Sequence, residues 1–313
     1  MKRTSSSSSP DIGAISAGVG AFFLWGLLPI YWKLLKAAPA WEILGHRIFW
    51  SAVFAGLMVS CGAGWSGVRA ALGDRRTCAG MALCSLLIAF NWGLYIWAVN
   101  AGYVLQGSLG YFIAPLLAVL LGVVVLGERL RRMQAIAIGL IVIAVAWLTW
   151  QSGQVPWIAL LLATSFSLYS LSRKKIKIHP IDGLFLEAIF LTVPALIYLG
   201  SLEARGIGSF GHGSMGFRAL LIFSGAVTGL PLILFTTAVR RLDLTLMGIL
   251  QYLSPTCQFL LAVFVYNEAL GIGKLCAFFV IWTAVALYLG DAIRGGRKKR
   301  GSKAKQKVTE EII

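Results

Sequence analysis

The sequence predicts an all-α polytopic membrane protein with ten transmembrane helices arranged as two inverted five-helix repeats. Hydrophobic residues make up 58% of the 313 residues and charged residues only 13%, whereas a soluble domain has about 25% charged residues. The apolar residues also form near-continuous runs of about 20, the length of a helix that crosses a bilayer, and strands of a membrane barrel would alternate at every second residue instead. A repetition at a spacing of 140 residues predicts the division into halves.

The predicted spans follow one another with mostly short connections. Those of the first half lie near 13–35, 41–62, 78–98, 105–126 and 132–150, and those of the second half near 156–172, 182–201, 217–238, 245–267 and 272–292. The predicted organisation is a disordered cytoplasmic N-terminus (1–12), a first repeat (13–150), a second repeat (153–292) and a basic cytoplasmic tail (293–313). The first run is longer than the apolar core of about 7–15 residues in a signal peptide, so we expect it to be retained.

The basic residues predict the orientation of the chain. With the N-terminus in the cytoplasm, 22 of the 28 lysines and arginines fall on the cytoplasmic side, as the positive-inside rule requires. Both termini are therefore predicted to be cytoplasmic, in the cell inner membrane. The net charge of +16 is assigned to these residues and to a tail that we expect to contact anionic lipid headgroups rather than nucleic acid.

The internal repeat is the strongest argument for transport that the residues themselves offer. Pro115 aligns with Pro255 and Glu128 with Glu268, because 255 − 115 and 268 − 128 both equal 140. Five spans carry the chain to the opposite side of the membrane, so the second half begins inverted. Two inverted halves around a shared site are a recurring design of secondary transporters.

Arg47 and Glu187 are ionisable residues inside predicted spans, where charge is costly and by default marks a functional site. The repeat aligns them, but inversion places them near opposite ends of the bundle. We therefore expect Arg47 to pair with Glu268, and Glu187 to pair with a cytoplasmic arginine such as Arg129. Structural and solute-binding roles stay open for both residues, and Glu187 is the first candidate for proton coupling.

Polar and aromatic residues inside the spans predict a solute path. Asn91 and Tyr95 share one helical face, which should point into the bundle because an amide exposed to lipid is costly. The full set of substrate-path candidates is Trp25, Tyr31, Arg47, Asn91, Trp92, Tyr95, Tyr111, Glu187, Gln251 and Tyr252. Pro115 and Pro255 are hinge candidates because proline removes a backbone hydrogen bond and favours a kink, although simple packing bends would explain them equally well.

Signatures of enzymes are absent from the sequence, which contains no nucleophile elbow, zinc-protease pair, Walker loop or dinucleotide fingerprint. The five cysteines form no Cys-x-x-Cys pair. We therefore expect no catalytic residues, no cofactor and no metal. Active transport would have to draw on a proton or ion gradient, or on a partner.

Several polar stretches recur in the order found in one known family: Trp25-Gly26-Leu27-Leu28-Pro29, Glu42-Ile43-Leu44-Gly45-His46-Arg47, Asn91-Trp92, Ile96-Trp97-Ala98-Val99-Asn100, Ser108-Leu109-Gly110-Tyr111-Phe112, Leu126-Gly127-Glu128-Arg129, Arg173-Lys174-Lys175 and Gln251-Tyr252. Over nearly all of 13–294 the sequence resembles the RarD family, in the EamA-like group of the drug/metabolite transporter superfamily. The resemblance implies ten helices, cytoplasmic termini, an inverted repeat, and export or exchange of small metabolites or drugs.

The function predicted from the sequence is thus secondary transport of a small solute across the cytoplasmic membrane by alternating access. The alternative is an integral membrane protein that does not transport, either an enzyme or an assembly partner. Substrate, direction, coupling ion and oligomeric state stay open, with a homodimer as the assembly considered.

Overall fold

The computed structural model describes residues 11–62, 64–151, 153, 155–265 and 272–310, and these form helices and connecting turns without a strand. Most of the predicted disordered N-terminus lies outside these residues. The helices are α1 (Ile12–Leu34), α2 (Ala40–Cys61), α3 (Ser66–Gly73), α4 (Arg75–Asn100), α5 (Val104–Leu126), α6 (Arg132–Gln151), α7 (Trp157–Lys175), α8 (Pro180–Ala204), α9 (Ser209–His212), α10 (Met215–Arg241), α11 (Leu244–Gln251), α12 (Leu253–Phe264) and α13 (Ile272–Glu310).

The predicted all-α membrane fold is confirmed. Nine helical segments of the described chain are long and apolar enough to cross a membrane, with α11 and α12 counted together as one segment. The remaining predicted span, the sixth, corresponds to α7 and does not meet this composition, because it contains several serines and ends on Arg173-Lys174-Lys175. It nevertheless packs against α4, α5 and α10. A helix that protein covers in this way can be less apolar than one that faces lipid.

The helix ends follow from local chemistry. The carboxylate of Asp74 accepts hydrogen bonds from the backbone N–H groups of Arg76 and Thr77 at the start of α4, and its bonds to Thr77 lower the pKa of Asp74. α5 ends before Gly127, which has a left-handed φ of 68° that glycine adopts without strain. Glu128 then accepts hydrogen bonds from the first two backbone N–H groups of α11, at 2.6 and 2.8 Å.

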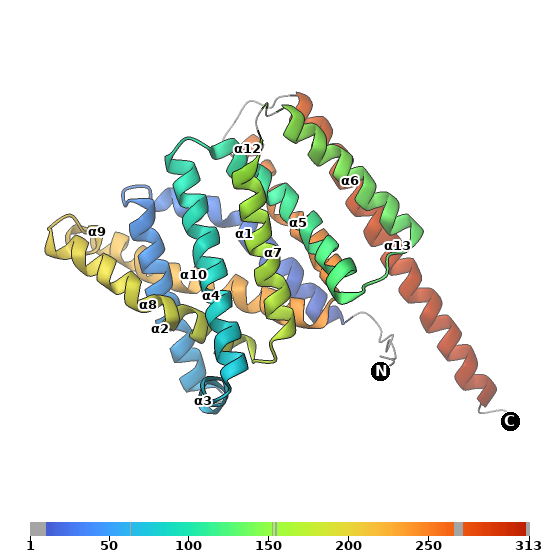
Figure 1. The fold of residues 1–313 in the computed structure, drawn as a ribbon, viewed down its shortest axis with the longest axis horizontal. Helices are drawn as coiled ribbons and strands as arrows, with labels where there is room; N and C mark the ends of the chain where they lie inside the picture. The colour runs from blue at the N-terminus through green and yellow to red at the C-terminus, as the bar shows by residue number, and fades with distance from the viewer. Residues whose placement is uncertain (1–10, 63, 152, 154, 266–271, 311–313) are drawn as a thin grey trace.

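The packing of the helices has an internal symmetry. α2 packs on α8, α5 on α11, and α6 on α13; α1 packs on α10 and α12, and α7 packs on α4 and α5. This pattern stays the same when each long helix of the first half is exchanged for its counterpart in the second half. Tyr252 even donates a hydrogen bond to the carbonyl of Phe112, exactly one 140-residue repeat earlier, at 3.0 Å. Figure 1 shows the α6–α13 pair along one edge of the bundle. The inversion of the halves and their bounds stay predictions.

The ninth predicted span is not one helix but two. α11 ends at Gln251 and α12 begins at Leu253. Pro255 contributes to this break because it has no N–H to donate to the carbonyl of Gln251. Pro115 in contrast lies inside the uninterrupted helix α5, where other contacts hold the helix together. Both prolines remain candidate hinges.

Candidate functional site

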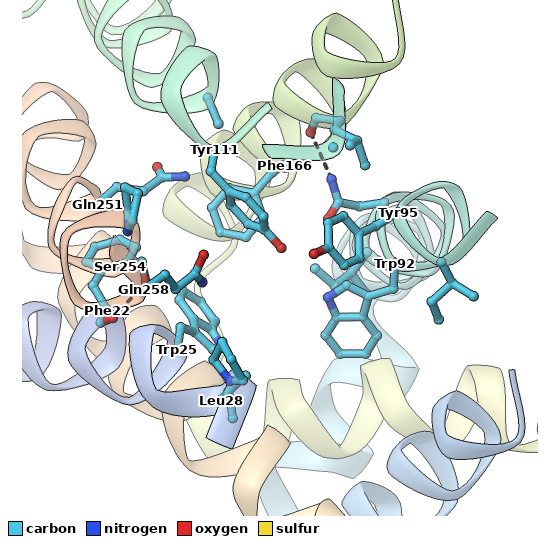
Figure 2. A pocket seen from close by; sticks show the side chains of 18 of the residues that line it. Phe22, Trp25, Leu28, Trp92, Tyr95, Tyr111, Phe166, Gln251, Ser254 and Gln258 are labelled. Carbon is cyan, nitrogen blue, oxygen red and sulfur yellow. Dashed lines mark hydrogen bonds between the residues drawn. The ribbon is translucent and has the colours of Figure 1, made fainter. Parts of the chain in front are cut away.

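A cavity of about 200 Å³, here called the central cavity, lies where α1, α2, α4, α5, α7, α11 and α12 meet. Both halves of the chain therefore contribute to its wall. Seven of the predicted path residues line it, namely Trp25, Arg47, Asn91, Trp92, Tyr95, Tyr111 and Gln251. In Figure 2, Trp25 and Gln258 stand on one side of this space and Trp92 and Tyr95 on the opposite side.

Aromatic side chains form a large part of the wall of the central cavity. The ring of Trp25 lies 5.6 Å from Phe22, 5.9 Å from Phe166 and 5.5 Å from Phe235, measured between ring centroids. Such tilted and edge-on contacts favour a fixed ring arrangement. On the other side, the rings of Tyr95 and Tyr111 meet edge to face at 5.7 Å. A flat or aromatic solute would find complementary surfaces here.

Arg47 is the one residue with a permanent charge among the described residues that line the central cavity. Its guanidinium carbon lies 4.6 Å from the ring centroid of Trp32 and 4.5 Å from that of Trp92, so two indole faces stabilise the cation. Its Nε donates a hydrogen bond to the hydroxyl of Thr228 at 3.0 Å. None of the ion pairs between described residues includes Arg47, and its predicted partner Glu268 lies outside the described residues.

The amide side chains in the wall differ in whether they are bonded to other protein groups. The NH₂ group of Asn91 donates hydrogen bonds to the carbonyl of Leu162 at 2.8 Å and to the hydroxyl of Ser165 at 2.9 Å, so it ties α4 to α7. Gln251 and Gln258 also line the cavity, and neither forms a hydrogen bond with another described side chain or backbone group. Their donors and acceptors are available to a solute.

Close packing holds α1 against α12 beside the cavity. The hydroxyl of Ser254 donates to the carbonyl of Phe22 at 2.7 Å. At Gly26 an added Cβ would lie 2.5 Å from the Cβ of Cys257 and 3.1 Å from the carbonyl oxygen of Ser254. Only glycine therefore allows this approach of the two helices.

Tyr31 and Tyr252 lie away from the central cavity. The hydroxyl of Tyr31 donates to the carbonyl of Leu220, and the buried Tyr252 bonds to Phe112 of α5. Both hydroxyls join neighbouring helices. The sequence could not distinguish them from path residues, because a tyrosine within a span has the same signature in either role.

Glu187 also does not line the central cavity, and it pairs with an arginine of the predicted cytoplasmic set, although this is Arg173 and not the named example Arg129. Its carboxylate pairs with the Nε of Arg173 at 3.3 Å and accepts a hydrogen bond from Tyr169 at 3.2 Å. α8 faces α4 and α2 here, and Arg173 comes from the last turn of α7, whereas Arg129 follows the end of α5. Topology predicts the side of the membrane on which a charge lies, but not the direction in which it points.

Further lining residues did not stand out in the sequence. Gln258 lies seven residues after Gln251, and this spacing of two amides on one helical face could have indicated it. Phe22, Phe166 and Trp32 also line the cavity, but aromatic residues in apolar helices carry no signal that separates a cavity wall from a lipid-facing surface.

Comparison with known proteins identifies relatives along most of the chain. Residues 12–150 match the model of the EamA-like transporter family. "Protein RarD" of Streptomyces exfoliatus is 42% identical over 283 residues, which cover 90% of each chain. An "uncharacterized transporter" of Vibrio cholerae is 41% identical over 286 residues, covering 91% of this chain and 95% of that one.

A solved structure, titled "Crystal structure of protein", has the same fold, with a TM-score of 0.67 and 19% identity, covering 88% of this chain and 96% of that one. The helices, the identity to the relatives and the family model agree with one another and with the resemblance seen in the polar motifs. The chain is therefore a multi-pass membrane protein of the RarD family, within the EamA-like transporters.

Proposed function

We propose that the chain is a secondary transporter that exports or exchanges small metabolites or drugs across the cytoplasmic membrane by alternating access. The observation that carries this proposal is the central cavity, because its wall combines helices of both halves. Its polar groups include a cation without a carboxylate partner among the described residues and two amides without a hydrogen bond to another described residue. A membrane protein that served only as a scaffold would have no reason to keep such groups unpaired. Relatives named as transporters support the same class.

The symmetry of the packing supports an alternating-access mechanism. α1, α2, α4 and α5 form one part of the wall, and α7, α11 and α12 form the other. Rocking of one part against the other would expose the same side chains first to one face of the membrane and then to the other. The break between α11 and α12 places a hinge candidate in the wall itself, since Pro255 lines the cavity.

The orientation that we propose has both termini in the cytoplasm. It rests on the distribution of lysine and arginine, most of which fall on the cytoplasmic side in this orientation. A proton or ion gradient is the proposed energy source. Glu187 stays the candidate for proton coupling.

The proposal is tested by thiol accessibility, which needs no knowledge of the solute. The five native cysteines are replaced, and single cysteines are introduced by Ala114→Cys in the cavity wall and by Ala144→Cys in the packed core between α6 and α13. Both native alanines are 4% exposed, so they form a matched pair. Membrane-impermeant reagents are then applied to right-side-out and inverted vesicles.

Alternating access predicts that the cavity cysteine reacts from either side of the membrane, and that the core cysteine reacts from neither. Reaction of the cavity cysteine from a single side would contradict the proposal and favour the non-transport alternative. Gel filtration of both variants in detergent verifies that they retain the native fold.

A further inference from the structure

The part of the central cavity that described residues line has an unbalanced charge. Arg47 contributes a permanent positive charge, and the described lining residues include no aspartate or glutamate. The carboxylate of Glu187, which lies in a separate small cavity with Trp92 and Thr228, is already paired with Arg173. Removing a cation from water costs free energy when no counter-ion accompanies it. A site that contains such a cation is therefore suited to bind an anion.

The contacts of Arg47 leave the hydrogen-bonding edge of its guanidinium open. The indoles of Trp32 and Trp92 lie against the guanidinium at 4.6 and 4.5 Å, and such contacts engage the faces of the planar group rather than its N–H bonds. Of its five N–H donors, Nε bonds to Thr228. The terminal N–H groups have no acceptor among the described residues. Their fork geometry fits a carboxylate with two parallel hydrogen bonds.

The rest of the wall limits what the anion can carry. The rings of Trp25, Phe22 and Phe166 form an apolar surface, which suits a hydrocarbon or aromatic body. The amides of Gln251 and Gln258 can bond one neutral polar substituent. Among the described lining residues, a second anionic charge would meet no second cation and an ammonium group would meet no carboxylate.

We infer that the central cavity binds an organic monocarboxylate with an apolar or aromatic body, and that Arg47 contacts its carboxylate. The inference rests on the proposed transport function and names the solute class of that site. Because the described lining residues include one cation and no carboxylate, we expect cations and dianions such as phosphate monoesters to bind more weakly.

Binding to the purified full-length chain in nanodiscs tests the inference with four probes that share a phenyl body. They are 3-phenylpropionate, its neutral amide 3-phenylpropanamide, the cation 3-phenylpropylamine and the dianion phenyl phosphate. Isothermal titration and the shift in thermal unfolding report binding. We expect the carboxylate to bind at least about tenfold more tightly than each of the other three.

Two variants test whether the guanidinium of Arg47 binds the carboxylate of the probe. Arg47→Met is expected to weaken carboxylate binding at least about tenfold, and Arg47→Lys, which keeps the charge but loses the fork, to retain part of it. Arg205→Gln is the matched control, since it removes an equal charge from an exposed position outside the cavity. It should bind the carboxylate like the parent.

The outcomes separate this inference from the proposed function. Equal or tighter binding of the amide, the amine or the phosphate, or no binding of the carboxylate, would overturn the inference while leaving the thiol-accessibility test untouched. Unchanged binding in Arg47→Met would overturn the role of Arg47. Carboxylate binding with a cavity cysteine that reacts from one side only would uphold the solute class and reject transport.

Discussion

Glu187→Gln is expected to destabilise the protein strongly, because it leaves a buried arginine without its counter-charge. The side chains of Arg173 and Glu187 are 0% and 5% exposed, and their closest atoms are 3.3 Å apart. At this distance and an effective dielectric constant of about 20, their attraction is about 5 kcal/mol. Loss of one partner of a buried pair typically costs about 3–5 kcal/mol. The two figures agree.

The surroundings of the pair explain why no other group would compensate for the missing carboxylate. The Nη1 of Arg173 contacts the sulfur of Met81 at 3.1 Å, a weak acceptor, and its Nε and Nη2 are buried without a hydrogen bond. In Glu187→Gln these buried groups would face a neutral amide instead of a carboxylate. We expect the free energy of unfolding to fall by about 3–5 kcal/mol.

Thermal unfolding of the detergent-purified variants measures this effect, with an expected decrease in Tm of roughly 6–10 °C. The double variant Arg173→Met/Glu187→Met should recover most of the loss, because no charge stays buried. The control is Asp291→Asn, which breaks an exposed pair of similar length, 3.2 Å to Arg131, and should cost less than about 1 kcal/mol. A cost below about 1 kcal/mol for Glu187→Gln would refute the reasoning and show that the carboxyl group is already neutral, as a proton-binding site requires.

Three further predictions address the helix contacts. Gly26→Ala should cost about 1–3 kcal/mol by forcing α1 away from α12, whereas Gly139→Ala, where an added Cβ meets nothing within 4 Å, should not destabilise; equal Tm values for the two variants would contradict the packing described. Tyr252→Phe removes one buried hydrogen bond and should lower the free energy of unfolding by about 1 kcal/mol, measured by denaturant titration, with no change expected if the bond is absent. Glu128→Ala uncaps α11 and should cost about 0.5–2 kcal/mol; faster hydrogen exchange confined to the first turn of α11 would support it, and unaltered exchange there would oppose it.

Apolar periodicity and length were sufficient to predict the class of fold and nearly all of the spans, because a bilayer imposes the same length and composition on every lipid-exposed helix. α7 shows the limit of this rule. Its span was found because its apolar residues form a run, yet its serines and basic end fall short of the composition of the other spans. Contacts with other helices, which a sequence does not display, make up the difference.

The site was predictable where polarity marked it and not elsewhere. Exposing a charged or amide side chain to lipid is costly, and this cost singled out Arg47, Asn91 and Gln251. All three line the central cavity. Tyr31 and Glu187 are equally polar, but they contact protein groups on neighbouring helices and do not line the central cavity. Burial of a polar group within a span therefore predicts that it has a partner, and the structure is needed to say whether that partner is protein or solute.

The position of α7 has a consequence for how the chain enters the membrane during synthesis. A segment with several serines and a basic end gains little from lipid by itself, so we expect it to insert poorly when it is the last segment to leave the ribosome. Its stable placement would then depend on α8, which follows after a short connection and is apolar. The orientation of the whole second half would be decided only after two of its helices have been made.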